Sequence, residues 1–172
     1  MTSVSVARER LAHATAALAE ALHDAQHDLW QDDKLNVAPT QIAATRRLRA
    51  KGVENFTAED LDYAMFKVMT TMGGESSFKF FLPRFIGAVL TFPTLGGWMT
   101  KSHVLLSKLE LIDLGAWAKP KQEALLAALD AFARFERSIA IDLSLKEGTA
   151  CPDPDEGVQD LIEFVRMRRE CR

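Results

Sequence analysis

Residues 70–90 read TTMGGESSFKFFLPRFIGAVL, and this stretch decides the fold class that the sequence predicts. The pair of glycines near its start predicts the end of one helix, because glycine is the commonest residue just past a helix C-terminus. After a short polar segment, Pro83 predicts the first turn of a new helix, where its missing N–H costs no hydrogen bond. The run 85–90 is apolar all round, as in a helix that other helices cover on several sides. We therefore expect an all-α fold, an irregular bundle of five to seven helices around a central apolar helix over 83–90.

Apolar residues recur at intervals of three and four along most of the chain, which is the spacing of amphipathic helices. No stretch alternates between apolar and polar residues over more than a few positions, so no strand is expected. Thr57 and Asp60 predict a capping box at the start of one helix, and Trp117 is expected to anchor the turn before another. The predicted helices cover residues 4–29, 40–50, 57–69, 83–90, 98–114, 120–143 and 158–167.

The length and composition of the chain indicate one globular domain. With 172 residues, 48% of them hydrophobic and 26% charged, the chain is long enough for a single substantial core. We expect residues 1–172 to form one helical domain. Within it, residues 144–157 contain Pro152, Pro154 and several acidic side chains, which predicts an acidic Pro/Gly loop before a short last helix.

The charge balance argues against a nucleic acid or a membrane as the partner. The chain has 21 Lys and Arg residues against 24 Asp and Glu, a net charge of −3, and the two signs are interspersed except for a basic cluster over 46–51. This composition offers no long-range attraction to nucleic acid or to an anionic membrane surface. The longest uncharged stretch, 85–100, is interrupted by Pro93 and a glycine pair, and it is too short to cross a bilayer. We expect the basic cluster to pair with neighbouring carboxylates.

The expected location of the protein is the cytoplasm. The N-terminal residues lack an apolar core followed by a small-residue cleavage site, so they are not expected to act as a secretory signal. Cys151 and Cys171 have neither the spacing of a metal site nor that of a disulfide framework, which favours reduced thiols.

Two motifs in the central part of the chain resemble a known family. The turn 70–73 reads Thr-Thr-Met-Gly, and the segment 78–84 ends in Phe-Leu-Pro-Arg. Together with residues 57–63, these motifs resemble an uncharacterised family of bacterial all-helical proteins that share a Thr-Thr-aromatic-Gly turn and a Phe-Leu-Pro-Arg motif. Met72 stands where the family pattern has tryptophan. The resemblance implies a soluble all-helical domain and no catalytic residue.

The histidines are the candidate metal ligands. His23 and His27 are four residues apart, the spacing that lets two imidazoles on one helix reach the same metal ion. Both lie away from the leucine stripe of their helix, and no third ligand is marked in the sequence, so we expect a solvated face and no metal. His103 lies in the first turn of another predicted helix, where we expect a structural role, with a ligand or general base as the alternative.

Residues 90–100 are expected to form a loop, because a proline and a glycine pair make a poor helix interior. Loops run over the surface, and tryptophan and methionine are enriched where proteins bind each other. The alternative is that Phe92 and Trp98 fold back as core anchors. Arg84, beside the proline, is expected to be partly buried and paired with a carboxylate or with helix-end carbonyls. The predicted partner-binding residues are Phe92, Leu95, Trp98, Met99 and Arg84.

No set of residues points to catalysis. The sequence has no glycine-rich phosphate loop after a strand, and no serine stands between the glycines of a hydrolase elbow. We therefore predict no catalytic residue, no cofactor and no metal, and we expect the partner to be another protein. The predicted function is a soluble non-enzymatic protein–protein interaction domain, such as an adaptor or a neutralising, immunity-type partner. The alternative is a helical enzyme that binds a metal or a small molecule through His23 and His27, or through His103.

Overall fold

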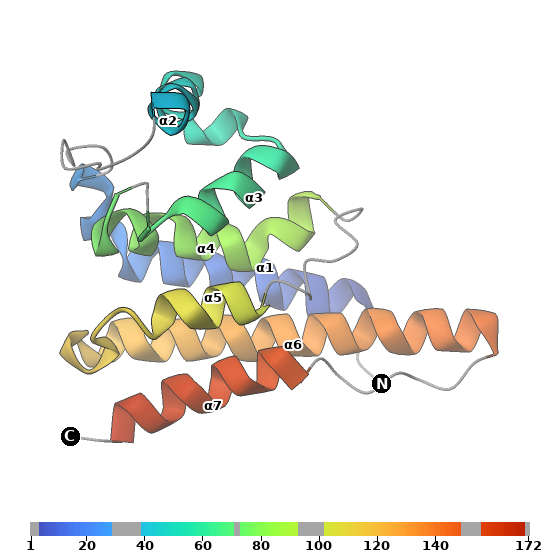
Figure 1. The fold of residues 1–172 in the computed structure, drawn as a ribbon. Helices are drawn as coiled ribbons and strands as arrows, with labels where there is room; N and C mark the ends of the chain where they lie inside the picture. Colours follow the sequence, from blue (N-terminus) through green and yellow to red (C-terminus); the bar gives the residue numbers. More distant parts are fainter. Residues whose placement is uncertain (1–3, 29–38, 71–72, 93–101, 149–155, 171–172) are drawn as a thin grey trace.

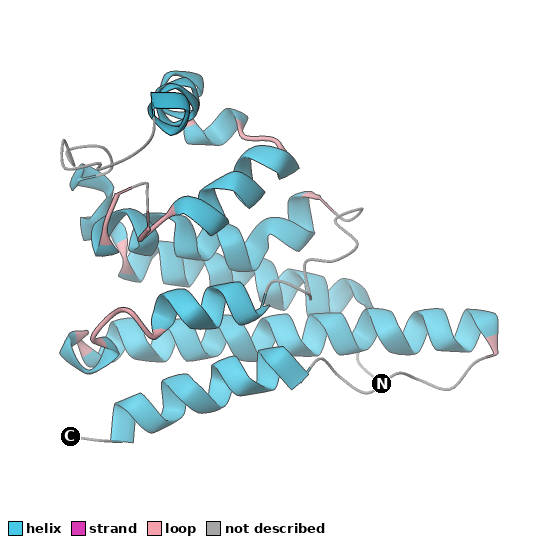
Figure 2. Cartoon of the chain, in the orientation of Figure 1, coloured by secondary structure: helices cyan, strands magenta, loops and turns pink. Residues whose placement is uncertain are grey.

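The fold was analysed in a computed structural model, which describes residues 4–28, 39–70, 73–92, 102–148 and 156–170. These residues form seven α-helices and contain no β-strand, so the all-α prediction is confirmed (Figure 2). The helices are α1 (Val4–Ala21), α2 (Pro39–Lys51), α3 (Ala58–Lys67), α4 (Glu75–Thr91), α5 (Ser102–Leu109), α6 (Lys119–Glu147) and α7 (Glu156–Glu170). Short 3-10 turns lie at η1 (His23–Asp28), η2 (Val53–Asn55) and η4 (Leu114–Ala116).

The longest helix, α6, runs the length of the molecule and has α1 along one side and α7 along another (Figure 1). α4 contacts α1, α3, α6 and η1, while α5 packs on α7. The C-terminal end of α6 extends past the neighbouring helices (Figure 1). No helix in the described ranges combines the length and the apolar character needed to cross a membrane.

The core is one connected cluster of buried apolar side chains to which all seven helices contribute. α4 supplies five of the eleven largest side chains that are fully buried, which makes it the central apolar helix that the sequence predicts. Two phenylalanine rings of α4 stack in series with Phe56, which lies between η2 and α3; the centroid separations are 6.0 Å between Phe56 and Phe81 and 5.6 Å between Phe81 and Phe85. Such ring pairs add to the free energy gained by burying their area. The five residues are Phe78, Phe81, Leu82, Phe85 and Ile86.

The start of the central helix differs from the prediction. α4 begins at Glu75, directly after the glycine pair, and Pro83 lies inside it rather than in its first turn. Gly73 has a φ of +64°, the left-handed conformation that glycine adopts without strain. Pro83 has no N–H to donate to the carbonyl of Lys79, but its buried ring adds to the core. The prediction was wrong because a proline inside a helix is tolerated when burial and neighbouring groups compensate for the lost hydrogen bond.

Three other boundaries also differ from the prediction. The first helix ends at Ala21, and the chain tightens into η1 instead of continuing as an α-helix to residue 29. The helix predicted over 98–114 is described from Ser102 and ends at Leu109. α6 continues through Glu147, so residues 144–147 of the predicted acidic loop are helical, and Gly148 ends the helix with a φ of +67°. Residues 149–155 of that loop lie outside the described residues, and residues 156–157 belong to α7.

The predicted capping box at the start of α3 is confirmed. The Thr57 backbone N–H donates to Asp60 Oδ2 over 2.9 Å, and the Asp60 N–H donates to Thr57 Oγ1 over 3.3 Å. Lys51, at the end of α2, donates to the same carboxylate, so part of the basic cluster pairs as expected. Burial raises the pKa of Asp60, but the hydrogen bonds from Lys51 and Thr57 outweigh this effect and lower the pKa to about 2.

Asp60 should therefore stabilise the fold at neutral pH and lose this effect in acid. The pKa of its carboxyl is lower in the folded state than the ordinary value of 3.8, which applies in the unfolded state. The contribution of Asp60 to the free energy of unfolding is therefore fully present at a pH well above 3.8. The contribution, about 2 kcal/mol, should disappear as the pH falls from 3.8 towards 2. We expect Asp60→Asn to lower the free energy of urea unfolding by this amount at pH 7 and by much less at pH 2.5. Glu59→Gln, at an exposed neighbouring carboxylate, is the control; an equal loss in both variants would contradict the assignment.

Trp117 anchors the turn before α6, as predicted. Its side chain is 4% exposed, and its Nε1–H donates to Glu75 Oε1 at the start of α4 over 3.1 Å. The Lys79 ammonium lies 4.9 Å from the centre of the indole ring. The buried Gln122 side chain donates to the Trp117 carbonyl over 3.1 Å. These contacts join the turn before α6 to the first turn of α4.

Truncating this anchor should cost far more than removing its one hydrogen bond. We expect Trp117→Ala to lower the free energy of unfolding by about 3–5 kcal/mol, the range for deleting a large buried side chain. Trp117→Phe keeps an aromatic ring and loses the bond to Glu75, so its cost should be about 1–2 kcal/mol. Urea unfolding followed by circular dichroism measures both. Equal losses in the two variants would show that the hydrogen bond, rather than the packing, carries the effect.

Candidate functional site

The structure brings together two of the five residues predicted to bind a partner. Arg84 and Phe92 lie on the same groove of about 450 Å³, which runs between α1, α4 and η2. Leu95, Trp98 and Met99 lie outside the described residues. We call this feature the Arg84 groove; it is lined by Ala12, Thr15, Ala16, Ala19, Val53, Glu54, Phe56, Leu61, Pro83, Arg84, Gly87, Ala88, Leu90, Thr91 and Phe92.

Small side chains form much of the Arg84 groove. α1 contributes three alanines to it, and α4 contributes Gly87 and Ala88. A Cβ atom added at Gly87 would lie 3.5 Å from Thr15 Cγ2, an ordinary van der Waals contact, so Thr15 bounds the space beside this glycine and leaves room for no more than a methyl group. The groove exists because residues without long side chains cannot fill the space beside the α1–α4 contact.

Arg84 lies at the groove in an arrangement that was only partly predicted. The side chain reaches solvent, but burial of part of the guanidinium lowers the pKa of Arg84, in keeping with the expected partial burial. Nη1 donates to the Phe80 carbonyl over 3.1 Å, a carbonyl in the interior of α4 rather than at a helix end as expected. The guanidinium carbon also lies 4.3 Å from the centre of the Phe80 ring. Since guanidinium has five N–H donors, most of them remain available to a ligand.

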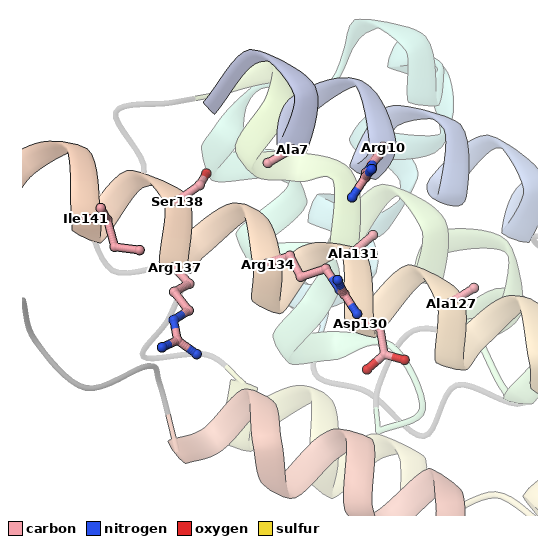
Figure 3. Close-up of a pocket in the computed structure, with 9 residues that line it drawn as sticks. All are labelled: Ala7, Arg10, Ala127, Asp130, Ala131, Arg134, Arg137, Ser138 and Ile141. Atoms are coloured by element: carbon pink, nitrogen blue, oxygen red, sulfur yellow. The ribbon is translucent and has the colours of Figure 1, made fainter. Parts of the chain in front are cut away.

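A second cavity, of about 480 Å³, lies between α1 and α6 (Figure 3). Its α6 residues recur at intervals of three and four and therefore form one face of the helix. Figure 3 shows Arg10 extending from α1, and Arg134 and Arg137 extending from α6. We call this feature the arginine cavity; its lining is Ala7, Arg10, Ala127, Asp130, Ala131, Arg134, Arg137, Ser138 and Ile141.

The arginine cavity has more positive than negative charge. It contains three guanidinium groups and one carboxylate, that of Asp130, and Asp130 already lies 3.4 Å from Arg166 of α7. The neighbouring acid on α6, Glu123, likewise pairs with Arg169 of α7 over 3.0 Å. Within the described ranges, the three arginines of the cavity form no ion pair. α7 thus neutralises the nearby acids of α6 and leaves the cavity cationic.

Sequence reasoning missed the arginine cavity. The spacing from Asp130 through Arg134 and Arg137 to Ile141 marks one face of α6 and is visible in the sequence. Arg10, however, lies far away in the chain and reaches this face only because α1 packs along α6. The sequence also gives no indication that Arg166 and Arg169 of α7 pair with Asp130 and Glu123 of α6.

The structure describes the surroundings of His23 and His103, two of the three candidate histidines, and places both at the surface. His23 is exposed, and its Nδ1 lies 2.9 Å from the Glu20 carbonyl. His27 follows in η1, so the chain at this point is a 3-10 turn and not the predicted α-helix. His103 is exposed on α5, and the described residues contain no group of three or more His, Cys, Asp or Glu placed to hold a metal ion.

Comparison of the chain with protein-family models, curated proteins and solved structures finds no match. The resemblance to a bacterial helical family therefore stays a prediction, and the candidate sites are argued from their geometry alone.

The contacts of Arg84 predict how its substitutions affect stability. Arg84→Ala should lower the free energy of unfolding by about 1 kcal/mol, because it removes an exposed cation–π contact and one hydrogen bond to the Phe80 carbonyl. Arg84→Met should cost less, since its thioether can still pack on the Phe80 ring. Thermal and urea unfolding test both variants. Unchanged stability in Arg84→Ala would show that these contacts contribute nothing in solution.

Proposed function

We propose that this chain is a non-enzymatic protein–protein interaction domain, of the adaptor or immunity type, that binds a short segment of its partner in the Arg84 groove. The proposal rests on one observation: Arg84 and Phe92 both line a groove whose other walls are largely small residues. Arginine and aromatic residues are enriched where partner proteins are bound most tightly.

The chemistry of the groove specifies the kind of segment that would fit. Its alanines and glycine leave room for apolar side chains, and Phe92 offers a partly buried aromatic surface next to them. The free donors of Arg84 favour a carboxylate, which guanidinium binds through two parallel hydrogen bonds. The carboxylate of Glu54 lines the same groove and its charge acts to raise the pKa of Arg84, but within the described residues no hydrogen bond or ion pair joins the two side chains. We therefore expect a segment of apolar residues next to an aspartate or a glutamate.

A peptide library displayed on phage tests the proposal, with two matched variants as targets. Ala16 and Ala17 are adjacent, exposed residues of α1, but only Ala16 lines the groove. Peptides selected on the wild-type chain should bind Ala16→Trp at least about tenfold more weakly, because the indole occupies the groove, and should bind Ala17→Trp unchanged. Fluorescence polarisation of the selected peptides gives the dissociation constants.

Two results would contradict the proposal. One is selection of no peptide above background on the wild-type chain. The other is equal binding of the selected peptides to Ala16→Trp and Ala17→Trp, which would place their site elsewhere. Arg84→Gln adds a further check, since it should weaken peptides that contain an acidic residue more than it weakens neutral ones.

A further inference from the structure

We infer that the arginine cavity is a binding site for a small organic anion, with a carboxylate or phosphate head group and a short apolar body. This site lies between α1 and α6, and it is separate from the Arg84 groove, which no residue of the arginine cavity lines. The inference therefore does not depend on the proposed function.

The head group is specified by the guanidinium groups. Arg10, Arg134 and Arg137 line one cavity from two helices, and none of them has an ion pair in the described part of the chain (Figure 3). Positive charges that line one cavity repel one another, and an anion bound in the cavity is attracted to all of them. Planar guanidinium also matches carboxylate and phosphate oxygens geometrically, since two N–H groups can donate in parallel.

Among the described residues, the one acid that lines the cavity already has a partner. Asp130 is the carboxylate of the cavity, and Arg166 of α7 already lies 3.4 Å from it. Ser138 lines the cavity too, but its hydroxyl donates to the Phe135 carbonyl over 2.7 Å. The donors that remain for a ligand are therefore those of the three arginines.

The apolar body is specified by the other walls of the cavity. Ala7 and Ala131 are buried beneath it, and Ala127 and Ile141 lie along α6 on either side of the charged residues. A volume of about 480 Å³ lies within the range of pockets that hold small molecules. Inorganic phosphate alone would leave most of this space and all of its apolar surface unused. A carboxylate or phosphate attached to a short hydrocarbon chain would contact both parts.

Four probes with the same six-carbon chain separate the contributions of charge and apolar contact. Hexyl phosphate, hexanoate, hexanol and hexylammonium are titrated into the full chain, and binding is followed by calorimetry and by backbone amide chemical shifts. We expect hexyl phosphate to bind most tightly and hexanoate next. Hexanol should bind at least about tenfold more weakly than hexyl phosphate, and hexylammonium should not bind. Binding of the two anions should weaken as salt is added.

Variants locate the site of binding. Arg134→Gln and Arg137→Gln should each weaken hexyl phosphate about tenfold, the loss expected for one charge-assisted hydrogen bond. Arg46→Gln, at an exposed arginine of α2, makes the same change of charge outside the cavity and should leave the affinity unchanged. Ala127→Trp fills the cavity without changing any charge and should abolish binding. Ala16→Trp, which blocks the Arg84 groove, should have no effect.

Three outcomes would overturn the inference. Hexanol binding as tightly as hexyl phosphate would show that the arginines do not recognise the anion. If Arg134→Gln and Arg46→Gln weakened the binding of hexyl phosphate equally, the net charge of the protein and not the cavity would explain the loss of affinity. Binding that persists in Ala127→Trp, with a circular dichroism spectrum like that of the wild type, would place the ligand elsewhere. Failure of the peptide selection would leave this inference standing, because the two tests concern different surfaces.

Discussion

The burial of three phenylalanine rings along α4 is the constraint on which the rest of the structure depends. Phe78, Phe81 and Phe85 are completely buried, and they recur at intervals of three and four, so they lie on one face of the helix. Covering that face requires α1, α3 and α6 to pack around α4. The same constraint turns Arg84, between buried Pro83 and Phe85, towards solvent, where it stacks on Phe80 at the Arg84 groove. The position of Arg84 on α4 thus follows from the packing of Pro83 and Phe85 on either side of it.

Both candidate sites arise from the composition of α1. This helix packs against α4 on one side and α6 on the other, and its contact-forming leucines are interspersed with alanines. Ala12, Ala16 and Ala19 lie beside α4 and line the Arg84 groove, while Ala7 lies beside α6 and lines the arginine cavity. An alanine allows two helices to approach but cannot fill the space on the flanks of their contact. A helix with longer side chains at these positions would close both sites.

The distribution of ion pairs decides which charges remain available for binding. Asp60 is held by Lys51 and by its capping box, and the acids on the flank of α6 are held by the arginines of α7. Although the net charge of the chain is −3, the arginine cavity beside α6 therefore has a local excess of positive charge. Electrostatic recognition depends on such local differences, since exposed charges farther apart than about 10 Å are screened by salt.

The sequence by itself determined the features that depend on residues close together in the chain. The three-and-four spacing is sufficient for the all-α class, and the capping box of Thr57 and Asp60 forms within a single turn, so both were predictable. Features that depend on contacts with distant parts of the chain were not predictable from the sequence. Pro83 stands inside α4 because buried contacts on several helices outweigh one lost hydrogen bond, and α1 ends at Ala21, where η1 begins to pack against α4. The arginine cavity joins Arg10 to Arg134 and Arg137 across most of the chain, and only the packing of α1 on α6 brings these charges together. Local spacing specifies helices, whereas the tertiary structure alone decides which helix faces meet.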